Sequence, residues 1–139
     1  MGERQAMTFV LDACAIIAYL RDEEGADVVE SALLGDNACV AHAVNVCEVY
    51  YDCLRRDGAA PADEFLEDLA SIGLITCEDM DAALWKTAGG YKAAIARVSL
   101  ADCFAMALTQ RLNAELVTSD HREFDPIAAL GICPIRFIR

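Results

Sequence analysis

Residues 8–20 read TFVLDACAIIAYL, a short apolar stretch that ends in an acid and continues at once into a second apolar stretch. Residues 8–11 are too short for a helix and rich in β-forming side chains, whereas residues 13–20 carry their large apolar side chains at helical spacing. The sequence therefore predicts a strand and then a helix, with Asp12 at the junction. In α/β proteins the carboxyl end of a strand is where ligands bind, although Asp12 can equally serve as the N-cap of the helix.

Short apolar stretches alternate with longer amphipathic ones along the rest of the chain. Further strands are predicted at residues 38–41, 74–77, 115–118 and within 132–138. Further helices are predicted at residues 26–34, 43–57, 61–71, 79–96 and 99–113. Gly89-Gly90 is expected to kink or break the helix over 79–96, and residues 124–126 (Phe-Asp-Pro) are expected to form a turn.

This alternation predicts an α/β fold. It is typical of a central parallel sheet, here of about five strands, with helices on both faces. Residues 42–66 are expected to form a helical hairpin that rises above the sheet. With 139 residues, 56% of them hydrophobic, the chain can bury one substantial core, so we expect a single domain over residues 1–139.

The cysteine content and the net charge limit the kinds of functional site and partner that we expect for this chain. Seven cysteines without a Cys-x-x-Cys pair, and only two histidines, argue against a zinc site and a disulfide framework. The net charge of −12 repels polyphosphate at long range, so it favours a basic protein partner or a site whose acids are masked by metal ions. Residues 1–5 lack the basic charge of a secretory leader, and no apolar run approaches the ~20 residues of a membrane helix. We therefore expect a cytoplasmic protein with no membrane contact and nothing cleaved.

Several acids interrupt otherwise apolar segments, at the ends of predicted elements or on a predicted helix. They are Asp12, Glu48, Asp102 and Asp120, with Asp125 as a fifth candidate. A parallel sheet gathers the carboxyl ends of its strands at one edge, so we expect these carboxylates to lie close together. Close carboxylates repel one another unless they are protonated or neutralised by a cation. Mg²⁺ and Mn²⁺ prefer such oxygen ligands and can activate a water for in-line displacement at phosphorus.

Each acid also has a purely structural interpretation. Asp102 fits a capping box that begins at Ser99, Glu48 and Asp52 can form a solvated helix face, and residues 118–120 can form a polar turn. A purely structural role for all of these acids together agrees less well with the sequence, because each of them interrupts an apolar segment.

Four blocks of the chain resemble the PIN domain family in their order and spacing. The blocks are VLDACAIIAYL (residues 10–20), VNVCEVYY (44–51), SLADCFAMAL (99–108) and LVTSDHREFD (116–125). Within the family they are most similar to the VapC-like toxin ribonucleases of prokaryotic toxin–antitoxin pairs. The resemblance implies a PIN-like three-layer α/β/α fold and a Mg²⁺-dependent endoribonuclease, for which Mn²⁺ can substitute. It also implies a homodimer that an antitoxin encoded beside it holds inactive.

The resemblance assigns roles residue by residue. The catalytic, metal-binding acids of the family fall on Asp12, Glu48, Asp102 and Asp120. The supporting polar positions of the family fall on Asn45 and Thr118. Asp125 is a further supporting candidate from the pattern of acids alone. Cys14 departs from the family pattern, which often has Ser or Thr there, and a thiol is a weak hydrogen-bond donor.

The basic residues are distributed unevenly along this acidic chain. Residues 82–101 contain Lys86, Lys92 and Arg97 and no acid. The same segment holds Trp85 and Tyr91, which can either stack on bases or belong to the core. We expect the backbone phosphates of RNA to contact this segment.

Two other classes of function remain open. One is a different phosphoryl-transfer enzyme. A haloacid-dehalogenase-type phosphatase, however, needs a second Asp at the position of Cys14. A phosphate-receiver domain needs a Lys late in the chain, and no Lys follows Lys92. The other is a catalytically silent PIN-like binding module, which a metal titration would distinguish from an enzyme.

Overall fold

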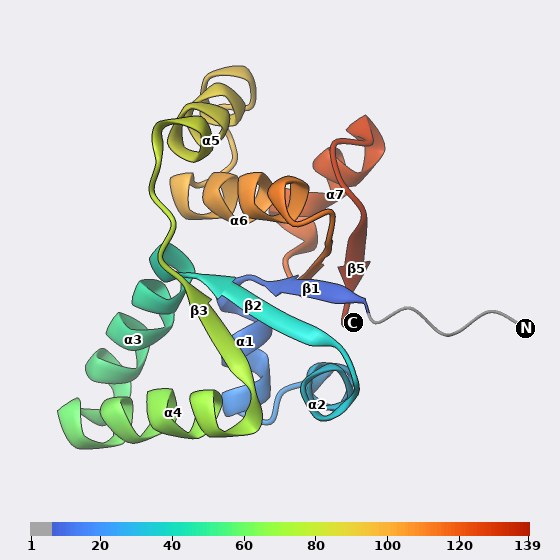
Figure 1. The fold of residues 1–139 in the computed structure, drawn as a ribbon. Helices are drawn as coiled ribbons and strands as arrows, with labels where there is room; N and C mark the ends of the chain where they lie inside the picture. Colours follow the sequence, from blue (N-terminus) through green and yellow to red (C-terminus); the bar gives the residue numbers. More distant parts are fainter. Residues whose placement is uncertain (1–6) are drawn as a thin grey trace, which may run out of the picture.

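Five parallel strands form one sheet in the order β3-β2-β1-β4-β5 in the computed structural model, which describes residues 7–139 (Figure 1). The strands are β1 (Thr8–Leu11), β2 (Ala38–His42), β3 (Leu74–Cys77), β4 (Glu115–Thr118) and β5 (Ile135–Phe137). Every neighbouring pair is parallel. The prediction that residues 1–5 are not part of a secretory leader concerns residues outside this described range.

Seven helices in the described part of the chain connect and cover the strands. They are α1 (Ala13–Leu20), α2 (Ala26–Leu34), α3 (Ala43–Asp57), α4 (Ala59–Ile72), α5 (Ala82–Ala94), α6 (Leu100–Arg111) and α7 (His121–Leu130). Figure 1 shows α1 to α4 on one side of the sheet and α5 to α7 on the other. The predicted three-layer α/β/α architecture is confirmed. None of the described helices is long and apolar enough to span a membrane.

The two cores follow from the alternation of side chains along a strand. Phe9 and Leu11 point into the core formed with α1 to α4, while Val10 points into the core formed with α5 to α7. β1 is buried on both faces because it lies at the centre of the sheet. Its last residue is followed directly by Asp12, which places that carboxylate at the middle of the carboxyl edge.

α3 and α4 pack against each other as the expected hairpin, with Gly58 between them. The pair lies on the α1 side of the sheet (Figure 1). α4 begins two residues earlier than predicted, so Pro61 occupies its third position, where a missing backbone N–H costs no helical hydrogen bond.

Two local predictions are wrong. α5 runs unbroken through Gly89 and Gly90, and its buried residues, Leu84 and Ala88, hold that face of the helix against the core. The predicted turn at residues 124–126 lies inside α7, where Phe124 and Ile127 are fully buried. Burial of two large apolar side chains outweighs the roughly 3 kcal/mol that a proline costs inside a helix.

Candidate functional site

Asp12 is fully buried between β1 and α1. Its Oδ1 accepts a hydrogen bond from the backbone N–H of Ala15 (2.8 Å), which makes it the N-cap of α1. Its Oδ2 accepts a hydrogen bond from the Thr118 hydroxyl (2.5 Å), at the end of the neighbouring strand β4. The capping interpretation of Asp12 is therefore correct, and it uses one oxygen of the carboxylate.

The end of β4 supplies two of the predicted site residues. The Thr118 hydroxyl accepts a hydrogen bond from the backbone N–H of Asp120 (3.0 Å), which leaves its proton directed at Asp12. The Asp120 side chain in turn caps α7, because its Oδ1 accepts from the N–H of Glu123 (3.1 Å). The adjacent ends of β1 and β4 thus hold Asp12 and Asp120 in one hydrogen-bonded unit.

Asp102 enters the site from the first turn of α6. The Ser99 side chain caps this helix by accepting from the Asp102 N–H (3.1 Å). Asn45, buried on α3, donates to the Ala101 carbonyl (3.3 Å), so it ties the start of α6 to the helix that carries Glu48. The side-chain carbonyl oxygen of Asn45 is buried without a partner.

Glu123 is a site residue that the sequence analysis missed. Carboxylate oxygens of Asp102, Asp120 and Glu123 all lie within 4.8 Å of one another. One Glu123 oxygen is buried without a hydrogen-bond partner. The Asp-x-x-Glu spacing of Asp120 and Glu123 is that of a capping box, and this signal could have predicted both the helix and the position of Glu123 beside Asp120.

The pKa shifts show that burial, and after it the neighbouring acids, disfavours negative charge at this site. Burial, which the Thr118 hydrogen bond only partly offsets, raises the pKa of Asp12 to about 7. Burial and the adjacent Glu123 and Asp12 carboxylates raise the pKa of Asp102 well above its ordinary value. Burial first, and then the charge of Glu123, raises the pKa of Glu48. All three shifts mean that negative charge at this site is costly without a cation.

The residues present fit a hard divalent cation. Such an ion takes carboxylate oxygens, and the site offers three within mutual reach. One oxygen of Glu123 is also buried without a hydrogen-bond partner. The Cys14 thiol faces the same acids, since burial and the charges of Asp12, Asp120, Asp102 and Glu48 all raise its pKa.

The other predicted residues lie elsewhere or have other partners. Asp125 points away from the acids, with its side chain 61% exposed and 2.8 Å from the His121 ring. Lys86 is exposed on α5 and lies near the Trp85 ring. The Lys92 ammonium donates to the backbone carbonyls of residues 96 (2.9 Å) and 98 (2.7 Å). Arg97 lines a cavity beside Asp120 and Glu123.

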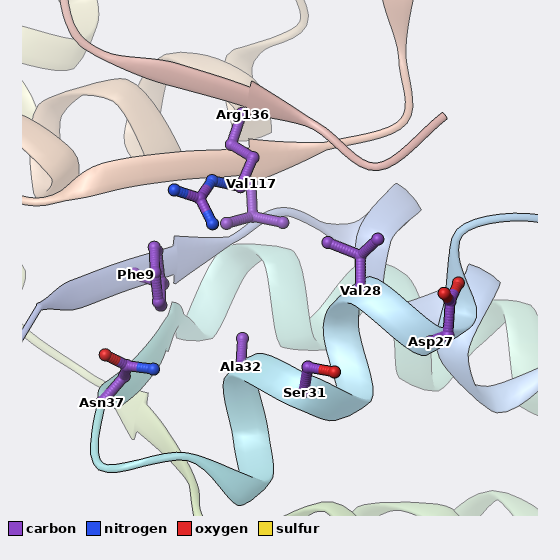
Figure 2. Close-up of a pocket in the computed structure, with 8 residues that line it drawn as sticks. All are labelled: Phe9, Asp27, Val28, Ser31, Ala32, Asn37, Val117 and Arg136. Carbon is purple, nitrogen blue, oxygen red and sulfur yellow. The ribbon is translucent and has the colours of Figure 1, made fainter.

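A separate cavity of about 310 Å³ opens on the other face of the sheet. Figure 2 shows Val28 and Ala32 of α2 on one side of it and Phe9, Val117 and Arg136 from the strands on the other. The Arg136 guanidinium lies over the Phe9 ring and binds Glu115 (3.0 Å). None of the predicted site residues lines this cavity.

The sequence matches the model of one protein family, which agrees with the three-layer fold and the cluster of acids. The PIN domain model matches residues 9–130, and the chain belongs to the PIN domain family. No curated protein matches the chain.

Solved structures with a similar fold include several VapC proteins. VapBC-1 of nontypeable Haemophilus influenzae has a TM-score of 0.73 at 16% identity, covering 95% of this chain and 98% of that chain. VapBC2 of Rickettsia felis, solved with a DNA fragment from its promoter, has a TM-score of 0.72 at 15% identity and covers 94% and 98%. VapC20 of Mycobacterium tuberculosis, a toxin that cleaves the sarcin–ricin loop, has a TM-score of 0.69 at 14% identity and covers 92% and 98%. At these identities the likeness shows a shared fold.

Proposed function

We propose that this chain is a Mg²⁺-dependent endoribonuclease and the toxin of a toxin–antitoxin pair. The observation that carries the proposal is the convergence of Asp102, Asp120 and Glu123 within 4.8 Å, with one Glu123 oxygen buried and unpartnered. PIN family membership and the VapC-like fold support it. Bound Mg²⁺ or Mn²⁺ would lower the pKa of a coordinated water and stabilise negative charge at phosphorus.

The side chains of the site have distinct roles in this proposal. Asp102, Asp120 and Glu123 hold the cation, with Asp12 behind them at the centre of the sheet edge. Thr118 keeps the Asp12 carboxylate in one orientation by donating to it. Glu48 lies on α3, outside the group of three acids, near enough to Glu123 for the two charges to interact, and in this proposal it completes the metal shell or orients the water.

The partners follow from the charge and from the structures of similar fold. A chain of net charge −12 favours a basic protein partner, and a similar fold occurs in a toxin–antitoxin complex from Klebsiella pneumoniae (TM-score 0.71 at 13% identity). We propose an antitoxin as that partner, RNA as the substrate, a homodimer as the active form and the cytoplasm as the location. We also propose that residues 1–139 form one PIN domain.

Asp102→Asn tests the catalytic assignment. The change keeps the shape of the side chain but removes a charge and a metal bond, so we expect RNA cleavage by the purified protein to fall by at least about a hundredfold. Asp36→Asn, on an exposed turn after α2, is the matched control and should cleave RNA like the parent.

The same assay separates the two classes of function. Growth arrest on expression of the parent, lost in Asp102→Asn and kept in Asp36→Asn, would agree with the cleavage result. A folded Asp102→Asn protein that remains as active as the parent would refute the site. A folded parent that binds the antitoxin but neither cleaves RNA nor responds to Mg²⁺ would instead support the binding-module alternative.

A further inference from the structure

The arginines of the described chain divide into two groups by their partners. All but two form ion pairs with carboxylates, as Arg111 does with Asp81 and Arg136 with Glu115. Among the described residues, Arg97 and Arg122 are the arginines without such a pair. In a chain with 23 acids and 11 bases, two guanidinium groups without a carboxylate partner stand out.

These two arginines line the same cavity. It has a volume of about 450 Å³, and its lining includes Asp120 and Glu123 of the acid cluster. The rest of its lining is apolar and comes from Ile95, Val98 and Pro126. The cavity therefore joins two cationic side chains and an apolar wall directly to the candidate metal site.

The backbone around both arginines is well supported. Arg97 lies in the turn between α5 and α6, where the Lys92 ammonium binds the carbonyls of Ala96 (2.9 Å) and Val98 (2.7 Å). Arg122 is the second residue of α7, whose N-cap is Asp120. The turn that carries Arg97 leads into α6, which carries Asp102, and Arg122 lies in the first turn of α7, which Asp120 caps, so the fold places both arginine backbones near the acids.

We propose that Arg97 and Arg122 form a phosphate-binding subsite for single-stranded RNA beside the acid cluster. This inference rests on the proposed ribonuclease function and names how an acidic protein holds its substrate. The two guanidinium groups take the phosphodiester of a nucleotide next to the scissile bond, and the apolar wall packs against its ribose or base. When a cation neutralises Asp120 and Glu123, the charge of the cavity becomes positive, which attracts phosphate.

The geometry favours a single strand over a duplex. A duplex presents its phosphates on a broad convex surface, whereas the 450 Å³ cavity is of the size that encloses one small ligand group. A flexible strand can turn one phosphate and its ribose inward, as proteins that read unpaired RNA commonly require.

The test measures RNA binding apart from cleavage. A fluorescein-labelled oligoribonucleotide without secondary structure is titrated with the full chain in Ca²⁺, which replaces Mg²⁺ at oxygen ligands. We expect Arg97→Gln and Arg122→Gln each to weaken binding at least about tenfold, and each to lower the slope of log Kd against log salt by about 0.7. Arg97→Lys and Arg122→Lys should keep the slope but lose part of the affinity, because lysine lacks the guanidinium fork.

Arg136→Gln is the matched control. It removes one guanidinium from the other face of the sheet, in the cavity of Figure 2, and should bind RNA like the parent. A rise of melting temperature with Mn²⁺ that is the same in all variants would show that the metal site and the fold are intact. A purely structural role for Arg97 or Arg122 would lower that melting temperature without changing the salt slope.

The outcomes distinguish this inference from the function on which it rests. If the parent cleaves RNA and both glutamine variants bind RNA as Arg136→Gln does, the subsite is refuted and the ribonuclease stands. If the glutamine variants keep RNA affinity but lose the antitoxin, the pair belongs to a protein interface and the subsite is refuted. If the parent binds RNA through these arginines yet cleaves none, the ribonuclease proposal fails and the subsite stands.

Discussion

At the scale of single residues, Asp12 combines structural support with an unfavourable charge. One oxygen caps α1 and the other accepts from Thr118, so both carboxylate oxygens are held by hydrogen bonds inside the core. Burial nevertheless raises its pKa to about 7 from the ordinary 3.8. The folded chain therefore binds a proton at Asp12 that the unfolded chain releases at lower pH.

This shift predicts that the metal-free protein loses stability as the pH rises. Between about pH 4 and pH 7 the unfolded state has lost the Asp12 proton and the folded state still holds it, so the free energy of unfolding falls with pH, by about 4 kcal/mol at ~1.4 kcal/mol per pKa unit. Asp12→Asn should remove this part of the slope and be more stable than the parent at pH 7. Urea titrations of both proteins at pH 5 and pH 7, with a chelator present, measure the free energy of unfolding. An equal fall of that free energy with pH in parent and variant would contradict the raised pKa of Asp12.

Cys14 is expected to be dispensable and unreactive. Asp12 takes its hydrogen bonds from Ala15 and Thr118, so no support comes from the thiol. Burial and the surrounding acids raise the Cys14 pKa well above its ordinary value, which leaves little thiolate. We expect the exposed Cys47 to react with iodoacetamide first at pH 8, as peptide mass analysis would show.

Cys14→Ser tests in the RNA cleavage assay whether the thiol is dispensable. It should keep metal-dependent RNA cleavage at about the parent level, because the hydroxyl replaces a group that holds neither Asp12 nor a helix cap. Complete loss of cleavage in a folded Cys14→Ser protein would assign the thiol a role in the site.

At the scale of elements, the start of α2 depends on one glycine. Gly25 has a φ of +93°, and a Cβ atom there would lie 2.6 Å from the Ile138 carbonyl oxygen. The contact joins the start of α2 to the segment that follows β5, at opposite ends of the sequence. The close approach of two backbones leaves no flexible side chain that could move aside.

Gly25→Ala is therefore expected to lower the free energy of unfolding more than the same substitution at another glycine whose φ is positive. Gly131, with a φ of +67°, has nothing within 4 Å of an added Cβ, so Gly131→Ala should cost only about 1–2 kcal/mol of backbone strain. Gly25→Ala should cost about 1–3 kcal/mol more, from the overlap with Ile138. Urea unfolding of the two variants compares them directly, and equal losses would show that the two backbones can separate.

At the scale of the whole molecule, the distribution of charge opposes the assembly of the site. The chain carries a net charge of −12, and the acids at the carboxyl edge of the sheet either closely follow β1 and β4 or lie on α6 and α7. Folding brings these charges together from distant parts of the sequence. A cation that binds only the folded chain must therefore stabilise the entire molecule.

We expect Mg²⁺ or Mn²⁺ to raise the melting temperature of the full chain. At a hundredfold excess over Kd the gain is about 2.7 kcal/mol, or roughly 5–10 °C for a domain of this size. Differential scanning fluorimetry with the divalent ion, compared with NaCl at the same ionic strength, separates site binding from general screening. Asp12→Asn should shrink the rise, and a melting temperature that ignores millimolar divalent ions would refute the metal site.

The sequence by itself determined the class of fold and the order of the described elements apart from α7, which it did not predict. Side-chain period and segment length distinguish buried strands from amphipathic helices, and short strands that alternate with helices favour a parallel sheet with helices on both faces. Asp12 and Asp120 could be placed at the carboxyl edge for the same reason, since each directly follows or closely follows a strand.

Only the tertiary structure decided which neighbouring side chains face the site. Glu123 and Asp125 are two residues apart on α7, a rotation of about 200° around the helix, so one joins the acids and the other points into solvent. The rotation of α7 is set by burial of Phe124 and Ile127 against the sheet, which also carries Pro126 into the helix. Arg122 reaches the cavity beside Arg97 for the same reason. Local sequence determines a helix and its apolar face, but which polar residues flank a site depends on what that face packs against.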